Sequence, residues 1–112
     1  MIKKYERIVC WDGFSMSVQA SEFAYCSPRD NEGAYIKVEV GYPSEQDDLL
    51  MPHIEWDYEY NEDADDAMFQ PVSNPTQTVY PYTPVGVVLA VIDNHGGMVS
   101  GELPPFKIDE EE

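Results

Sequence analysis

The first half of the chain alternates apolar and polar residues with the two-residue period that is typical of half-buried β-strands. Residues 5–11 are rich in β-forming residues, and Asp12-Gly13 is a turn signal that separates them from a second alternating run at 14–19. Residues 35–41 alternate again, with Ile36, Val38 and Val40 on one predicted face and Tyr35 on the other. This pattern predicts a β-hairpin followed by a third strand.

Residues 54–60 show the most regular alternation in the chain. If they form one strand, its acidic positions project from one face about 6.6–6.8 Å apart, while its aromatic positions contact the core. The even positions are Ile54, Trp56, Tyr58 and Tyr60, and the odd positions are Glu55, Asp57 and Glu59. After this strand we expect a solvated loop at 61–66 and irregular structure at 67–81, where Pro71 and Pro75 interrupt any regular element.

One helix is predicted at about 84–95. Thr83 can cap it, Pro84 can take the first helical position, and Gly96-Gly97 ends it. Its apolar stripe has the i, i+3, i+4, i+7 spacing that covers a sheet. The stripe consists of Val85, Val88, Leu89 and Ile92, and a short last strand is expected at Met98–Ser100.

These elements predict an α+β fold: a mainly antiparallel sheet of four to five strands with the helix packed on one face. We expect a single compact domain over residues 1–108, with an acidic strand and loop at 45–66. Residues 109–112 are all acidic and are expected to form a flexible tail.

The charge of the chain is its strongest functional signal. The 112 residues carry a formal net charge of −16, and residues 38–106 contain thirteen acidic side chains but no lysine or arginine. Ten of those acids lie between Glu45 and Asp66. Like charges oppose compaction, so such a stretch indicates a basic partner, a bound cation or a requirement for solubility.

Composition narrows the class of protein. A hydrophobic content of 43% with fourteen aromatic residues indicates a globular chain. No apolar run approaches 18 residues and no signal-peptide pattern opens the sequence, so we expect a cytoplasmic protein with no membrane contact. Six scattered basic residues cannot outweigh the acids, so direct binding of nucleic acid is not expected.

The sequence contains few indications of a catalytic site or a metal site. No serine or cysteine lies in a nucleophile motif, so we expect no enzymatic activity and no cofactor. Cys10, Cys26, His53 and His95 have the composition of a zinc site but not its spacing, which favours reduced thiols and a helix-end role for His95. The carboxylates at 63–66 could bind calcium, but they lack the glycine and distal glutamate of an EF-hand.

Four parts of the chain carry a resemblance: residues 12–20, 25–29 and 40–44, and the run 79–105. They resemble parts of small bacteriophage-encoded proteins that have no assigned activity. The acidic segment 55–66 is extra relative to that pattern, which implies an elaboration on a shared scaffold. In size and charge the chain is also similar to viral DNA-mimic inhibitors of the anti-CRISPR, anti-restriction and glycosylase-inhibitor types.

The sequence therefore predicts a non-enzymatic phage protein whose negative surface occupies the basic groove of a host nucleic-acid-binding or defence protein. The main alternative is a structural, assembly or homo-oligomeric protein that uses its aromatics and the segment 79–84 for contacts, with charge for solubility. A second alternative is a cation-binding module. The predicted partner-binding residues are Glu55, Asp57, Glu59, Glu62, Asp63, Asp65 and Asp66, with Tyr58 and Tyr60 as aromatic anchors.

Overall fold

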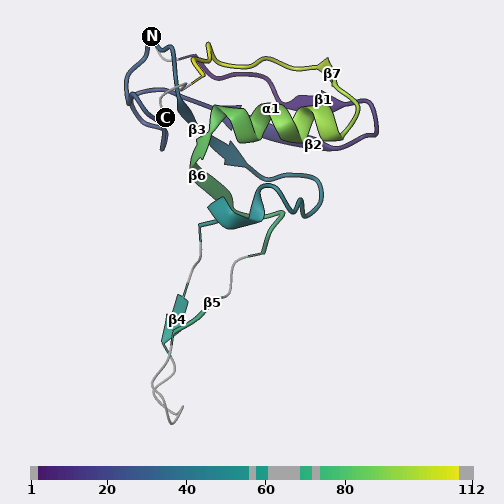
Figure 1. Cartoon of the computed structure of the whole chain (residues 1–112). Coiled ribbons are helices and arrows are strands. Elements are labelled where there is room, and N and C mark those ends of the chain that lie inside the picture. The colour runs from purple at the N-terminus through teal and green to yellow at the C-terminus, as the bar shows by residue number, and fades with distance from the viewer. Residues whose placement is uncertain (1–2, 56–57, 61–68, 72–73, 109–112) are drawn as a thin grey trace.

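A computed structural model describes residues 3–55, 58–60, 69–71 and 74–108, and describes 58–60 and 69–71 by their backbone alone. The described chain forms a five-stranded antiparallel sheet in the order β6-β3-β2-β1-β7 with one α-helix, so the predicted α+β class is confirmed (Figure 1). The strands of this sheet are β1 (Ile8–Cys10), β2 (Ser15–Gln19), β3 (Lys37–Gly41), β6 (Val79–Pro84) and β7 (Met98–Ser100).

The predicted hairpin is β1 and β2, which pair in the register Ile8↔Met16. Its turn is closed by a hydrogen bond from the Cys10 backbone N–H to the Phe14 carbonyl, 2.8 Å, while Asp12 Oδ1 accepts the backbone N–H of Phe14 at 2.9 Å. The even positions of the second run, Phe14, Met16 and Val18, are all buried. The alternation at 14–19 therefore identified the core face of β2 correctly.

Helix α1 (Val85–Asn94) runs between the two edge strands β6 and β7 and covers one face of the sheet (Figure 1). Two details of the prediction are wrong. Thr83 does not cap the helix: its hydroxyl is buried and donates to the Tyr80 carbonyl at 2.9 Å, and Pro84 is the N-cap residue. Val91 is buried in the helix–sheet contact, whereas Leu89 is exposed, because the buried arc of α1 is rotated toward Val91 relative to the predicted stripe.

Strand β6 lies in a segment where irregular structure was predicted through residue 81. It contains Pro81 and Pro84, which lack the N–H that a central strand must donate. An edge strand tolerates proline because one of its sides has no ladder partner, and β6 is at the edge of the sheet. The prediction for Tyr35 is also corrected, because this residue was expected within the third strand. It precedes β3 and is buried, and its hydroxyl donates to the Asp30 carbonyl at 2.7 Å.

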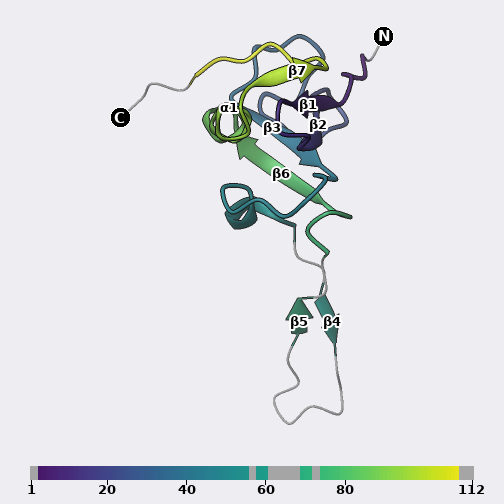
Figure 2. The same cartoon turned by 90° about the vertical axis from the view of Figure 1, so that its right-hand side faces the viewer.

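The acidic segment departs most from its prediction. Strand β4 covers only Tyr58–Tyr60 and pairs antiparallel with β5 (Phe69–Pro71) in a separate two-stranded sheet. Ile54 and Glu55 precede β4 and follow the 3₁₀ helix η1 (Met51–His53), so no single strand spans 54–60. Both views show β4 and β5, here called the arm, well apart from the five-stranded sheet (Figures 1 and 2).

Candidate functional site

The arm leaves the sheet from a well-packed root. Leu50 has no exposed surface and Ile54 is 7% exposed, and both belong to the hydrophobic core. The backbone N–H of Glu55 donates to the Val79 carbonyl at 3.0 Å, so the chain leaves for the arm and re-enters β6 at the same place. The root is therefore fixed by burial and by this backbone contact.

The predicted site residues divide at this root. Glu55 is partly buried at the root and does not belong to β4, so the predicted strand-ordered row of Glu55, Asp57 and Glu59 is wrong in its first member. In the backbone register Tyr58 pairs with Pro71, Glu59 with Gln70, and Tyr60 with Phe69. The predicted contacts Asp57, Glu62, Asp63, Asp65 and Asp66 lie outside the described residues, as does the predicted tail at 109–112.

A second acidic feature lies beside the root. The imidazole of His95 contacts two carboxylates at once, with Nδ1 2.6 Å from Asp12 Oδ2 and Nε2 2.7 Å from Asp47 Oδ2. Its ring is stacked on Phe14, with centroids 4.0 Å apart and an angle of 6° between the planes. This Asp12–His95–Asp47 bridge connects the β1–β2 turn, the end of α1 and the segment that leads into η1.

The bridge favours a charged imidazole. Burial opposes protonation of His95, but the hydrogen bonds to Asp12 and Asp47 outweigh it and raise the pKa of the imidazole above 6.5. The hydrogen bond from His95, together with the one from the Phe14 backbone N–H, lowers the pKa of the Asp12 carboxyl below 3.8. An imidazolium donates through both ring nitrogens, which matches the two carboxylates it contacts.

The geometry of the bridge indicates a structural role. Both ring nitrogens are occupied by carboxylates of the same chain, so neither is available to move a proton on a substrate. Asp47 also caps the turn into η1, because its Oδ1 accepts the Leu49 N–H at 2.9 Å and its carbonyl accepts the N–H groups of Leu50 and Met51. Asp47 is 6% exposed, so it does not contribute to the acidic surface that the sequence suggested.

Sequence reasoning missed this bridge, although it placed His95 correctly at the helix end. The two carboxylates lie 83 and 48 residues away along the chain, so no local spacing relates them to the histidine. The one sequence feature that pointed to the bridge was Asp12 in the predicted turn. A turn aspartate uses one carboxylate oxygen to cap its own loop, and the other oxygen can accept a further hydrogen bond.

Three of the six basic side chains interact with other residues of the same chain. Lys3 Nζ lies 3.1 Å from Glu102 Oε2, the Arg7 guanidinium donates to Ser15 and to the Tyr42 carbonyl, and Arg29 lies over the ring of Tyr25. All six occur at or before residue 37 or at residue 107. The acidic segment therefore has no basic neighbours in its own sequence to neutralise it.

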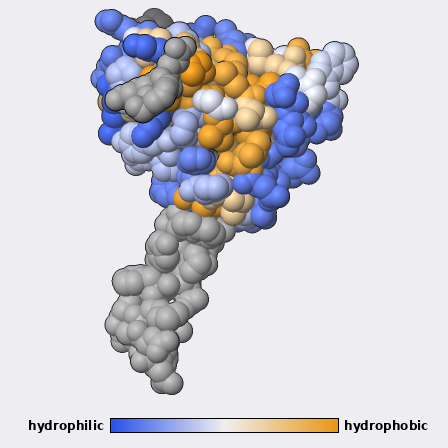
Figure 3. Space-filling view, in the orientation of Figure 1, coloured by the Kyte–Doolittle hydropathy of each residue, from blue (hydrophilic) through white to orange (hydrophobic). Residues whose placement is uncertain are grey.

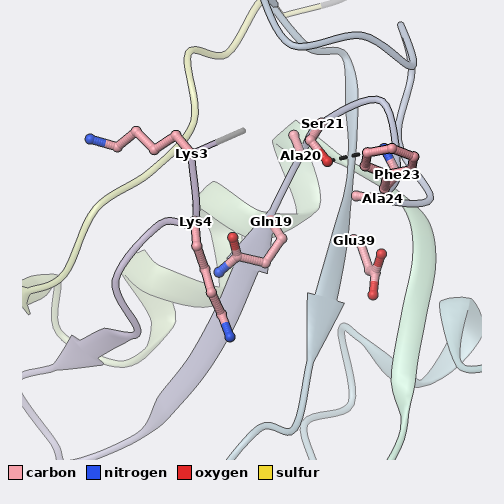
Figure 4. Close-up of a pocket in the computed structure, with 8 residues that line it drawn as sticks. All are labelled: Lys3, Lys4, Gln19, Ala20, Ser21, Phe23, Ala24 and Glu39. Atoms are coloured by element: carbon pink, nitrogen blue, oxygen red, sulfur yellow. Dashed lines mark hydrogen bonds between the residues drawn. The ribbon is translucent and has the colours of Figure 1, made fainter. Parts of the chain in front are cut away.

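A shallow hollow of about 240 Å³ lies between the N-terminal segment, the end of β2 and the loop that follows it. Its lining is largely apolar and includes Phe23 and Ala24, with Lys4 on one side and Glu39 on the other (Figure 4). The Glu39 carboxylate accepts the Tyr25 backbone N–H at 2.9 Å, so it is already engaged. The hollow offers no pair of groups arranged for catalysis.

The remaining candidates give no metal site among the residues the structure describes. Cys10 and Cys26 are free and buried, as expected for reduced thiols. Within the described ranges, no three His, Cys, Asp or Glu side chains are grouped to hold a metal ion. The carboxylates at 63–66 lie outside those ranges. Over the same described residues, no helix has the length and apolar content needed to cross a membrane.

Comparison with known proteins adds no relative. No protein-family model matches the chain, and no similar protein was found among curated sequences or among solved structures. Over its described residues the chain is an α+β protein with a five-stranded antiparallel sheet, one helix and a separate two-stranded arm.

Proposed function

We propose that this chain is a non-enzymatic, phage-encoded inhibitor that binds a host nucleic-acid-binding or defence protein, of the kind targeted by anti-CRISPR and anti-restriction proteins. The contact is the negative surface centred on the arm, and the site of action is the host cytoplasm. One observation carries the proposal. The arm lies apart from the main sheet, and its strand β4 belongs to the stretch 45–66, where ten acids and no lysine or arginine occur (Figure 2).

Electrostatics favours a partner that binds this chain in a positively charged groove. Proteins that bind nucleic acid line their grooves with lysine and arginine, and a segment with ten acids and no lysine or arginine is complementary to such a groove in charge. Complementary fields accelerate association and make it sensitive to salt. At the root of the arm, the Glu55 backbone N–H donates to the Val79 carbonyl, which fixes the point where the chain leaves the core.

A structural or assembly role is the second candidate, and one feature favours it. Tyr25 and Tyr82 are both partly exposed, their ring centroids lie 6.0 Å apart, and the Tyr82 backbone N–H donates to the Tyr25 carbonyl. Tyr82 belongs to the edge strand β6, which is the segment expected to form contacts in an oligomer. Light scattering separates the two functions, since a defined oligomer without affinity for basic proteins supports assembly.

The proposal is tested by capture from bacterial lysate at low and at high salt. The immobilised chain should retain a nucleic-acid-binding protein at low salt, release it at high salt, and lose it to added duplex DNA, since both ligands occupy one groove. The decisive variant combines Glu55→Gln, Asp57→Asn and Glu59→Gln, which removes three charges from the arm and its root. We expect this variant to fold normally and to capture the partner poorly.

A matched control removes three charges elsewhere, through Glu6→Gln, Glu32→Gln and Glu110→Gln. It changes net charge equally, so it separates a local contact from a general effect of acidity. Equal loss of capture by both variants means that only total charge matters. Full capture by the arm variant contradicts the proposal.

A further inference from the structure

Helix α1 is apolar on both of its faces. Its first eight residues, 85–92, include no polar side chain. Val85, Val88, Val91 and Ile92 are buried against the sheet. On the opposite side Gly86, Leu89 and Ala90 are exposed. A surface helix normally carries polar residues on its outer face, and a helix that is apolar all round is normally buried all round.

This outer face is part of a larger apolar area. Figure 3 shows the apolar surface over α1 continuing toward η1, at the side of the molecule from which the arm extends. Leu49, which precedes η1 along the chain, is 41% exposed, and Met51 in η1 is partly buried against the core. The root residue Glu55 follows η1 by two positions. The apolar area therefore extends toward η1, the element that precedes the acidic segment along the chain.

We infer that the outer face of α1 is a docking surface for an amphipathic basic helix of the partner protein. The inference rests on the proposed function and specifies which part of the partner is bound. The apolar stripe of that helix packs on Leu89 and Ala90, and its lysines and arginines extend toward the arm. Charge complementarity selects this occupant, because residues 38–106 hold thirteen acids and no lysine or arginine.

Two small residues make close helix packing possible. Gly86 and Ala90 are one helical turn apart on the outer face, so they lie in one row along α1. A Cβ added at Gly86 meets no atom within 4 Å, so the fold itself does not require glycine there. Glycine weakens a helix relative to alanine because it loses more backbone entropy on folding. A partner backbone that approaches α1 at this row is a reason for glycine to occur at this position.

A second copy of the chain fits this surface less well. Each copy carries a net charge of −16, and the exposed Asp93 lies at the end of the same helix face. Apposition of two such faces brings like charges together, which opposes association. A basic helix is attracted by the same negative charges.

The test uses two synthetic peptides of about 18 residues, or five helical turns, made of leucine and lysine in equal composition. In the first, the leucines form one helical stripe, and in the second the order is permuted so that no stripe exists. Both carry the same charge, so general attraction to an acidic protein is equal. We expect titration calorimetry to show the stripe peptide binding about 10-fold more tightly, which corresponds to burial of roughly one leucine side chain.

Leu89→Glu should reduce binding of the stripe peptide to the level of the permuted one. Ala90→Glu is a second variant on the same face, to be used if Leu89→Glu does not fold. The control is Phe23→Glu, which adds the same charge at a 69% exposed residue of the loop after β2 and should preserve the preference. Thermal melting verifies that each variant is folded.

Equal binding of both peptides to the unmodified chain overturns the docking inference. A dimer of the unmodified chain that Leu89→Glu dissociates also overturns it, since a second copy then covers the face. Neither result bears on the arm, whose role is decided by the charge variants at 55, 57 and 59. The docking inference and the proposed function can therefore fail separately.

Discussion

The imidazole of His95 lies flat on the ring of Phe14, with an interplanar angle of 6° and a centroid separation of 4.0 Å. This stacking holds the histidine in the plane where each ring nitrogen contacts a carboxylate, Asp12 on one side and Asp47 on the other. The contact connects the end of α1 to the turn of the first hairpin and to the root of the arm. One side chain therefore joins three segments that are far apart in the sequence.

Replacement of His95 with glutamine should lower the free energy of unfolding by about 2–4 kcal/mol, because the buried Asp47 carboxylate loses its cationic partner. Urea denaturation measures this change. His53→Gln is the matched control, since His53 lies partly exposed at the end of η1 and should contribute little. Equal effects of the two substitutions would show that the bridge does not stabilise the fold.

The contribution of His95 should depend on pH in a defined direction. Its folded-state pKa is raised above 6.5, so the bridge stabilises fully below about pH 6.5 and loses this contribution as pH rises through the raised pKa. The pKa of Asp12 is lowered below 3.8, so its contribution is present above that value and is lost as pH falls through the lowered pKa. Stability differences between the parent and His95→Gln should therefore be largest between about pH 4 and 6.5, measured by melting at a series of pH values. A difference that grows above pH 8 contradicts this assignment.

Two glycines should respond oppositely to alanine. Gly101 has φ +108°, and an added Cβ would lie 2.3 Å from the Arg7 carbonyl oxygen and 2.7 Å from Ile8 Cα, so Gly101→Ala should destabilise by about 2–4 kcal/mol or more. Gly86 has helical backbone and open space around it, so Gly86→Ala should stabilise by about 0.5–1 kcal/mol. Melting temperatures measure both. A stabilising Gly101→Ala would show that the β7 segment does not approach β1 closely.

Removal of the arm should leave the main sheet intact. Residues 56–73 can be replaced by a flexible glycine-serine linker of about six residues, since the backbones of Glu55 and Val79 are already in contact and the linker reaches Asn74 easily. β4 and β5 pair only with each other within the described residues, so circular dichroism and the melting temperature should change little. Capture of the basic partner should be lost. Unfolding of the shortened chain would show that the arm is part of the folding unit.

The elements that were predicted correctly are those whose sequence pattern spans only a few neighbouring residues. The β1–β2 hairpin and the short β7 are encoded by alternation and turn residues within a few positions, and both occur where predicted. The helix is also local, and its bounds differ from the predicted ones by a single residue at each end. Leu89 was misplaced because the arc of α1 that the sheet covers depends on how the helix crosses it.

The acidic segment shows the limit of periodicity. Alternation through residues 54–60 is equally compatible with one long strand and with a buried turn followed by a short strand. The structure has the buried turn followed by a short strand. Ile54 packs in the core, and its backbone N–H donates to the Met51 carbonyl at 3.2 Å. Strand β6 was hidden for a related reason, because proline disfavours strands except at an edge, and sequence does not state which strand is the edge.

The sequence by itself determined the elements with local periodicity, the fold class and the concentration of negative charge between residues 45 and 66. Tertiary structure alone decided that Asp47 leaves the acidic surface to join Asp12 and His95, and that the outer face of α1 remains apolar and uncovered by the described chain. The physical reason is sequence distance. Burial and ion pairing depend on which residues meet in space, and these partners are 83 and 48 positions from His95.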